Sequence, residues 1–213
     1  MFEFDNIDFL KNKNITVLCS GNSSNNYLDS NDILLVPNRS ILMPQIEKYE
    51  KIIWVNGTGW QRKNVLSWWK ELAKEIKKHP QYMLVRYSPG YEKEYAIFEK
   101  EFREILPITK IEKISISSNS SGILSTGMRC IKLAIDSQVS NISVAGMEMG
   151  ENTKYSSILL ENEIVAKKGN DSFTRHLNGD IQYLKNLTKP EIKKIIPVFG
   201  SGLYHYMRKK NDI

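Results

Sequence analysis

His176 is the residue of this chain whose chemistry best suits proton transfer. It is one of only three histidines, and it stands just before a predicted helix that Asn178 or Asp180 would cap. Imidazole titrates near neutral pH, so a positioned histidine can take a proton from a hydroxyl group. His176 is therefore interpreted either as a catalytic base or as a polar residue at a helix start. His79 and His205 are interpreted as structural or surface residues.

Small polar residues recur where the predicted strands end. Small side chains let a ligand approach the backbone, and amides and hydroxyls can bind phosphate, ribose or base. The carboxyl ends of parallel strands share one edge of the sheet, where ligands bind. The sequence therefore predicts a binding cleft at that edge, lined by SGNSSNN (20–26), PNRS (37–40), NGTGW (56–60), SSNSSG (117–122) and GMEMGEN (146–152).

Several common kinds of site are disfavoured. The 20–26 turn matches neither GxGxxG nor GxxxxGK[ST], so neither NAD binding nor a P-loop is expected. Cys19 and Cys130 lie far apart in apolar segments, and with three scattered histidines they do not make a zinc set. Both are expected to be buried free thiols. Glu148 could bind a ligand or a metal, but no Asp-x-Asp pair accompanies it, so no metal is expected.

Ser120 or Ser121 is expected to cap an apolar helix over 120–137. The free N–H groups and partial positive charge of such a helix start can hold a carboxylate or phosphate. A serine cap without any ligand is the alternative interpretation.

The elements that must position these residues alternate along the chain. Helices with one apolar face are predicted over 61–79 and 91–106, besides the one at 120–137. Pro197 should confine the last strand to an edge or shorten it. Short apolar runs predict strands at 14–20, 32–38, 51–57, 81–87, 112–118, 141–147 and 193–200.

This alternation predicts an α/β fold: a single Rossmann-like domain over 1–213, with a mostly parallel sheet of six to seven strands and helices on both faces. The long polar stretch 147–177 interrupts the rhythm and is predicted to be a lid or active-site loop.

Composition narrows the class of protein. The chain has 213 residues, of which 41% are apolar, enough for a buried core. No apolar run approaches the about 18 residues of a membrane span, and the first residues do not resemble a secretory signal. A cytoplasmic protein is therefore expected. The net charge of +6 suits an anionic ligand or membrane surface. Basic and aromatic residues do not interleave as in a nucleic-acid groove, so no nucleic-acid partner is expected.

Taken in order, these stretches resemble the bacterial sialyltransferases of glycosyltransferase family 42. ITVLCSGNSS is similar to the family's first strand and Gly-Asn-Gly-Pro-Ser nucleotide loop. Gly21 and Asn22 match this loop, and Ser23 takes the place of its second glycine. LLVPNRS and IIWVNGT resemble the segments whose asparagines follow the next two strands, which gives Asn38 and Asn56.

The second half of the chain carries further similarities. Ser120, Ser121 and Gly122 take the places of the family's Thr-Ser-Gly helix start. Tyr155 falls at its second lid tyrosine. RHLNGDIQYL resembles its His-x-x-Asn-x-Asp-Ile helix start and provides His176. Two family residues are replaced: an arginine before Thr-Ser-Gly, near Ser118 here, and a tyrosine at Gly150.

The resemblance implies a GT-A-like variant of the fold and an inverting, metal-independent glycosyltransferase. Such an enzyme moves a sialic acid or related nonulosonic acid from its CMP-activated donor to a hydroxyl of a cell-surface glycan, as in lipooligosaccharide or capsule biosynthesis. It needs no cofactor, because the CMP-sugar is a substrate. His176 would be the base and Tyr155 would donate to the leaving phosphate. The substrate would be held by Gly21, Asn22, Ser23, Asn38, Asn56, Ser120, Ser121 and Gly122.

Two alternatives stay open. The donor could carry another CMP-linked acid, such as Kdo, legionaminic or pseudaminic acid, or the protein could be a non-catalytic nucleotide- or glycan-binding relative. The expected partners are the CMP-activated donor and a glycan or glycolipid acceptor. A peripheral contact with the inner face of the cell membrane and a homo-oligomer are left open.

Overall fold

The computed structural model describes residues 8–25, 27–57, 63–87, 90–115, 124–149 and 176–211. Seven strands form one sheet in the order β5-β4-β3-β2-β1-β6-β7, and every neighbouring pair is parallel. The predicted α/β fold with a parallel sheet is confirmed. The strands are β1 (Asn14–Leu18), β2 (Ile33–Pro37), β3 (Lys51–Asn56), β4 (Tyr82–Tyr87), β5 (Lys110–Ser115), β6 (Asn141–Ala145) and β7 (Ile195–Pro197).

Helices connect the strands. The α-helices are α1 (Lys63–Lys74), α2 (Glu92–Ile105), α3 (Thr126–Asp136), α6 (Leu177–Asn186), α7 (Lys189–Lys194) and α8 (Gly202–Asn211). Short 3-10 helices are η1 (Asp8–Leu10), η2 (Asn22–Ser24), η3 (Asn38–Leu42) and η4 (Pro44–Lys48). The sequence prediction missed α7 and α8. A capping box between Thr188 and Glu191 marks the start of α7, so that helix carried a readable signal.

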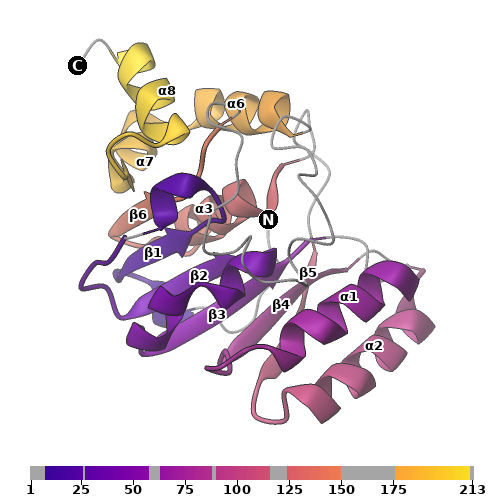
Figure 1. The fold of residues 1–213 in the computed structure, drawn as a ribbon. Coiled ribbons are helices and arrows are strands. Elements are labelled where there is room, and N and C mark those ends of the chain that lie inside the picture. Colours follow the sequence, from indigo (N-terminus) through magenta and orange to yellow (C-terminus); the bar gives the residue numbers. More distant parts are fainter. Residues whose placement is uncertain are drawn as a thin grey trace.

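Two hydrophobic cores lie on opposite faces of the sheet. One face packs against α1 and α2, through residues such as Trp69 and Phe98. The other packs against α3, α6 and α8, through residues such as Ile131, Leu184 and Leu203. Figure 1 shows α1 and α2 together on one side of the molecule and α6 to α8 at the other.

The direction of the chain explains this division. From β3 to β5 each new strand is added on the same side, whereas α3 carries the chain back across the sheet to β6, next to β1. Crossovers between parallel strands are right-handed, so a reversal of direction moves the connecting helix to the opposite face. The carboxyl ends of β1 and β6 therefore flank the point of reversal, which is where open parallel sheets bind ligands.

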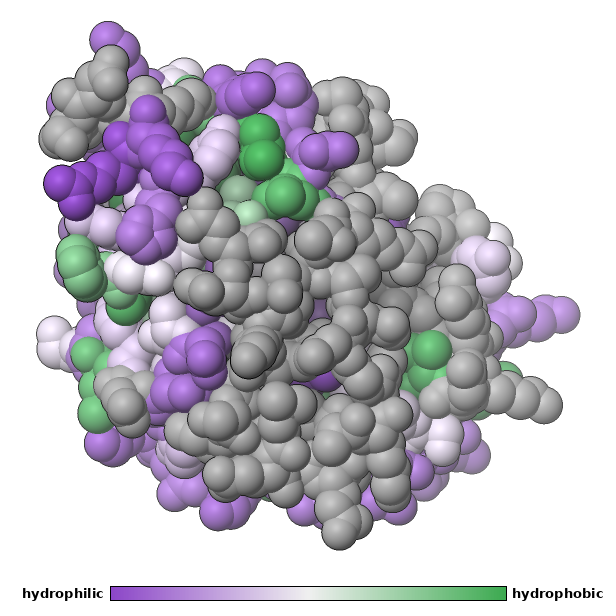
Figure 2. Space-filling model, turned by 45° about the horizontal axis from the view of Figure 1, so that its top comes forward, coloured by the Kyte–Doolittle hydropathy of each residue, from purple (hydrophilic) through white to green (hydrophobic). Residues whose placement is uncertain are grey.

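Two further expectations concern the edge and the surface. β7 is a three-residue edge strand that ends at Pro197, as the proline predicted. Among the described helices, none is long and apolar enough to cross a membrane. Figure 2 brings the top of Figure 1 forward, and on that face hydrophilic residues predominate among the described ones, with separate hydrophobic groups between them.

Candidate functional site

Two glycines allow the turn after β1 to pack against the end of β6. The N–H of Gly21 donates to the carbonyl of Gly146 at 2.9 Å. A Cβ on Gly21 would overlap Glu148, and one on Gly146 would overlap the backbone of Cys19. Gly146 also has a φ of +72°, in the left-handed region that favours glycine. The predicted site residue Gly21 therefore shapes the point of strand reversal through its lack of a side chain.

Glu148 holds this turn in place. Its side chain is buried, and its two carboxylate oxygens accept hydrogen bonds from the N–H groups of Ser23, at 2.8 Å, and Gly202, at 3.3 Å. The hydroxyl of Ser23 accepts from the N–H of Gly146 at 3.0 Å. Glu148 and Ser23 thus serve the architecture of the turn. Asn22, the neighbouring predicted site residue, is exposed at the same edge.

Asn38 and Asn56, both predicted to line the cleft, differ in their bonding. The side chain of Asn38 accepts from the N–H of Gly57 and donates to the hydroxyl of Thr126, each at 3.0 Å. It therefore joins the ends of β2 and β3 to the start of α3. Asn56 is only 1% exposed, and its amide oxygen and nitrogen have no hydrogen-bond partner among the described residues. A buried amide without partners is unfavourable, so Asn56 is the better candidate for a ligand contact.

The start of α3 differs from its prediction. The helix begins at Thr126, and the hydroxyl of Ser125 caps it by accepting from the N–H of Met128 at 3.1 Å. The prediction of a cap at Ser120 or Ser121 is therefore wrong, and both residues lie outside the described ranges with Gly122.

The same order of two hydroxyl residues and a glycine recurs at 125–127. A Cβ on the glycine at 127 would collide with the Cys19 sulfur, so close packing requires glycine there.

The helix that follows His176 also begins differently from its prediction. α6 starts at Leu177 with His176 at the capping position, and no side chain caps it. Asn178 and Asp180 both lie inside the helix, so the prediction that one of them caps it is wrong. The carboxylate of Asp180 instead accepts from the N–H of Ser125 at 2.8 Å.

This hydrogen bond joins the two helix starts. Asp180 is 5% exposed, and its own N–H donates to the carbonyl of His176 at 3.0 Å, one helical turn back. His176 is half-buried. The structure therefore brings the predicted base to the end of α6 that is attached to the start of α3, although 55 residues separate Asp180 from Ser125.

Burial dominates the electrostatics of this contact. It raises the pKa of Asp180 to about 6, against the lowering effect of the hydrogen bonds from Ser125 and of the charge on Arg129. It also lowers the pKa of Arg129 to about 10. Burial and the two nearby carboxylates, Asp180 and Glu148, raise the pKa of the Cys19 thiol, which stays neutral. Both cysteines are free and buried, as predicted.

Arg129 was missed by the sequence prediction. The signal was a charged residue inside a helix that was predicted to be buried, a position where arginine is rare without a partner or a function.

The remaining predicted features are of two kinds. Tyr155 and nearly all of the predicted lid, 150–175, lie outside the described residues. His205 is exposed on α8, as expected for a surface residue, and His79 is half-buried.

Four functional groups are found among the described residues at the carboxyl edge of the sheet. They are the imidazole of His176, the first turn of α3, the amide of Asn56 and the buried guanidinium of Arg129. Together they could accept a proton, hold an anion and bind a neutral polar group. No protein-family model matches the sequence, and no curated protein or solved structure matches it significantly.

Proposed function

We propose that this protein is an inverting, metal-independent glycosyltransferase. It transfers a sialic acid or related nonulosonic acid from the CMP-activated donor to a hydroxyl group of a glycan. The observation that carries the proposal is the hydrogen bond from Ser125 to Asp180, which holds the His176 end of α6 against the start of α3.

The proposed reaction requires a base for the acceptor hydroxyl. A sugar hydroxyl is a weak nucleophile, and a positioned histidine can remove its proton as the new bond forms. His176 has this role in the proposal. Asp180 positions it, because the carboxylate fixes the first turn of α6 to another element of the fold.

The donor carries two negative groups, a carboxylate on the sugar and the phosphate of CMP. The first turn of α3 offers N–H groups and the positive end of a helix dipole. The Thr-Ser-Gly helix start of the resembled family corresponds better to 125–127 than to 120–122, because α3 begins at Thr126. The hydroxyls of Ser125 and Thr126 therefore replace Ser120 and Ser121 in the proposal.

The neutral parts of the donor need polar partners without charge. Asn56 supplies an amide at the end of β3 that has no hydrogen-bond partner in the described part of the chain, and Asn22 an exposed amide in η2. Gly21 lets the turn that carries Asn22 pack closely against Gly146 and Glu148. Tyr155 keeps its proposed role of hydrogen bonding to the leaving phosphate, so that no metal is required.

A donor panel tests the proposal directly. The protein is incubated with CMP-activated sialic, legionaminic, pseudaminic and Kdo acids, with and without lipooligosaccharide or capsular acceptors, in the presence of a chelator. The expected result is acceptor-dependent release of CMP from one donor, with inversion at the anomeric carbon seen by NMR. Tight CMP binding without release from any donor would instead identify a non-catalytic binding protein.

A further inference from the structure

Arg129 is a buried cation that forms no ion pair with any residue the structure describes. Its side chain is 5% exposed, and its Nε atom is shut off from solvent without a hydrogen bond to any described residue. None of the ion pairs found among the described residues includes it. Most buried charges in proteins are paired, because removing an ion from water costs several kcal/mol. The cost of this arrangement therefore needs an explanation.

One cation and one carboxylate, Arg86 and Asp180, act on the charge of Arg129 from nearby. The guanidinium of Arg86 lies close enough to lower its pKa, and Asp180 is the acidic group that acts on it in the opposite direction. The pKa of about 10 still leaves Arg129 charged at neutral pH. The hydrogen bonds of the Asp180 carboxylate go to Ser125, so it does not neutralise Arg129 by direct contact.

Arg129 also lies beside the positive end of α3. It is the fourth residue of the helix, and its N–H bonds to the carbonyl of Ser125 at 3.0 Å. Long side chains on a helix lean over the turn that precedes them, here the turn of Ser125 and Thr126. Two independent sources of positive potential, the guanidinium and the helix start, therefore act on the same space at the carboxyl edge of the sheet.

We propose that Arg129 and the first turn of α3 form a binding site for an oxyanion of the substrate, a carboxylate or a phosphate. The guanidinium would donate charge-assisted hydrogen bonds to the anion, a partner that none of the described residues provides. The proposal rests on the proposed function only for the identity of the molecule that carries the anion.

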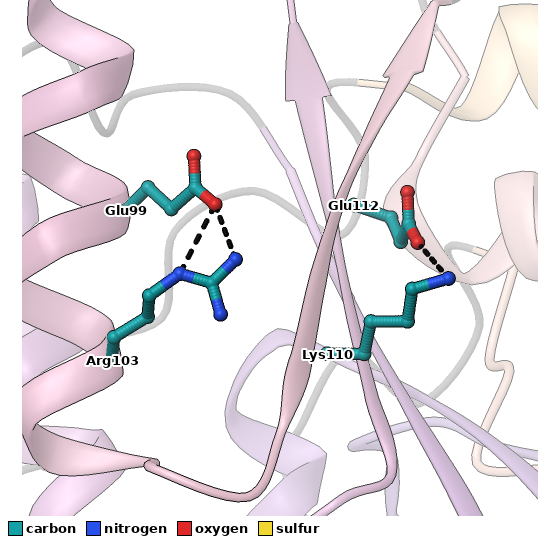
Figure 3. A network of polar contacts seen from close by, with 4 residues as sticks. All are labelled: Glu99, Arg103, Lys110 and Glu112. Carbon is teal, nitrogen blue, oxygen red and sulfur yellow. Dashed lines mark hydrogen bonds and ion pairs between the residues drawn. The ribbon is translucent and has the colours of Figure 1, made fainter.

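Matched variants separate this role from a general effect of charge. Arg129→Gln removes the buried cation and keeps a polar side chain, and Arg129→Lys keeps the charge. Arg103→Gln is the control, because it removes the same charge from an exposed arginine of α2 that pairs with Glu99 (Figure 3). Calorimetry measures the binding of three probes to each protein: inorganic phosphate, free sialic acid, which has only a carboxylate, and CMP, which has only a phosphate.

We expect Arg129→Gln to weaken binding of at least one probe roughly ten- to hundredfold, the range expected for lost hydrogen bonds to a charged group. Arg129→Lys should recover part of the affinity, and Arg103→Gln should bind like the wild type. Loss for free sialic acid alone identifies a carboxylate site, and loss for phosphate and CMP identifies a phosphate site. Equal affinities of the wild type and Arg129→Gln for every probe would overturn the proposal, as would a wild type that binds none of them.

Thermal unfolding without ligand gives a second criterion. A residue kept for a ligand should not be needed for folding, so Arg129→Gln should melt at or above the temperature of the wild type. A lower melting temperature together with unchanged binding would assign Arg129 a structural role. If phosphate binds through Arg129 but CMP binds no better than phosphate, the anion site stands and the proposed CMP-dependent function fails.

Discussion

Charged side chains are arranged in opposite ways in two regions of the molecule. On α2 and β5 they lie on the surface as ion pairs, and Figure 3 shows two of these, Glu99–Arg103 and Lys110–Glu112. At the contact between α3 and α6, by contrast, Arg129 and Asp180 are each 5% exposed and are not joined in an ion pair.

The two arrangements have different energetic consequences. Exposed ion pairs contribute about 0 to 1 kcal/mol, because water and salt screen them. Buried charges must be compensated by hydrogen bonds, by a counter-charge or by a ligand. The charges on α2 and β5 therefore keep that part of the surface hydrated. The charges between α3 and α6 carry a desolvation cost, and this region is where function is expected.

The largest effect on activity is expected from substitution of His176, which Asp180 positions. His176→Ala should reduce transfer roughly 100- to 10,000-fold, the usual contribution of general base catalysis, with CMP binding retained. Initial rates of CMP release measure the loss. His205→Ala, on the exposed part of α8, is the control and should keep wild-type activity. Equal activity of the two variants would rule out His176 as the base.

Asp180→Ala should have the next largest effect. It leaves the N–H of Ser125 and the charge of Arg129 without their acidic neighbour, at a cost of about 3 kcal/mol in the free energy of unfolding. Asp136→Ala is the matched control, because that aspartate is exposed on α3 and pairs with Lys132. Its effect should stay within about 0.5 kcal/mol. Denaturant titration compares the two, and equal losses would contradict the contrast between the regions.

A smaller effect is expected on the pH dependence of stability, which tests the same carboxylate of Asp180. Folding raises the pKa of Asp180 from its usual 3.8 to about 6, so the folded protein binds a proton more readily than the unfolded chain between these values. Stability from this group is therefore lost as pH rises from about 4 to about 6, by about 2 to 3 kcal/mol. Asp180→Asn keeps an acceptor for Ser125 but cannot titrate. The stability difference between wild type and Asp180→Asn should change across this window, and a constant difference would contradict the assignment.

The smallest effect is expected on the surface. Arg103→Gln breaks the pair with Glu99 and should change the free energy of unfolding by about 0.5 kcal/mol or less. The change should shrink further in 1 M salt, which screens exposed charges. Urea titrations at low and high salt measure it. A loss as large as that of Asp180→Ala would mean that exposure does not distinguish the two regions.

Much of the fold could be predicted from the sequence, because its strands are buried on both faces. Such strands are continuous apolar runs, like Ile33–Pro37 in β2, and they end where small polar residues begin. The proline at 197 marked the edge strand in the same local way. α8 was missed because its apolar face is narrow and its residues are mostly polar or basic.

The site was harder to predict, because its bonding joins residues far apart in the chain. Serines at 120, 121 and 125 are all plausible caps by type, and only the packing of α3 selects Ser125. Asp180 is an ordinary capping residue by position, yet its partner lies 55 residues earlier. That Asn56 and the Nε atom of Arg129 have no hydrogen-bond partner among the described residues depends on the whole surrounding fold, so no local pattern could reveal it.

The strand order has a consequence for how the protein is made. β1 pairs with β6, whose partner residues lie more than 120 positions later, so a nascent chain keeps one side of its first strand open until residue 145 has left the ribosome. The five strands β1 to β5 can pair during this delay. One apolar face of these strands stays uncovered until α3 is added, and such exposed apolar surface favours aggregation of the incomplete chain.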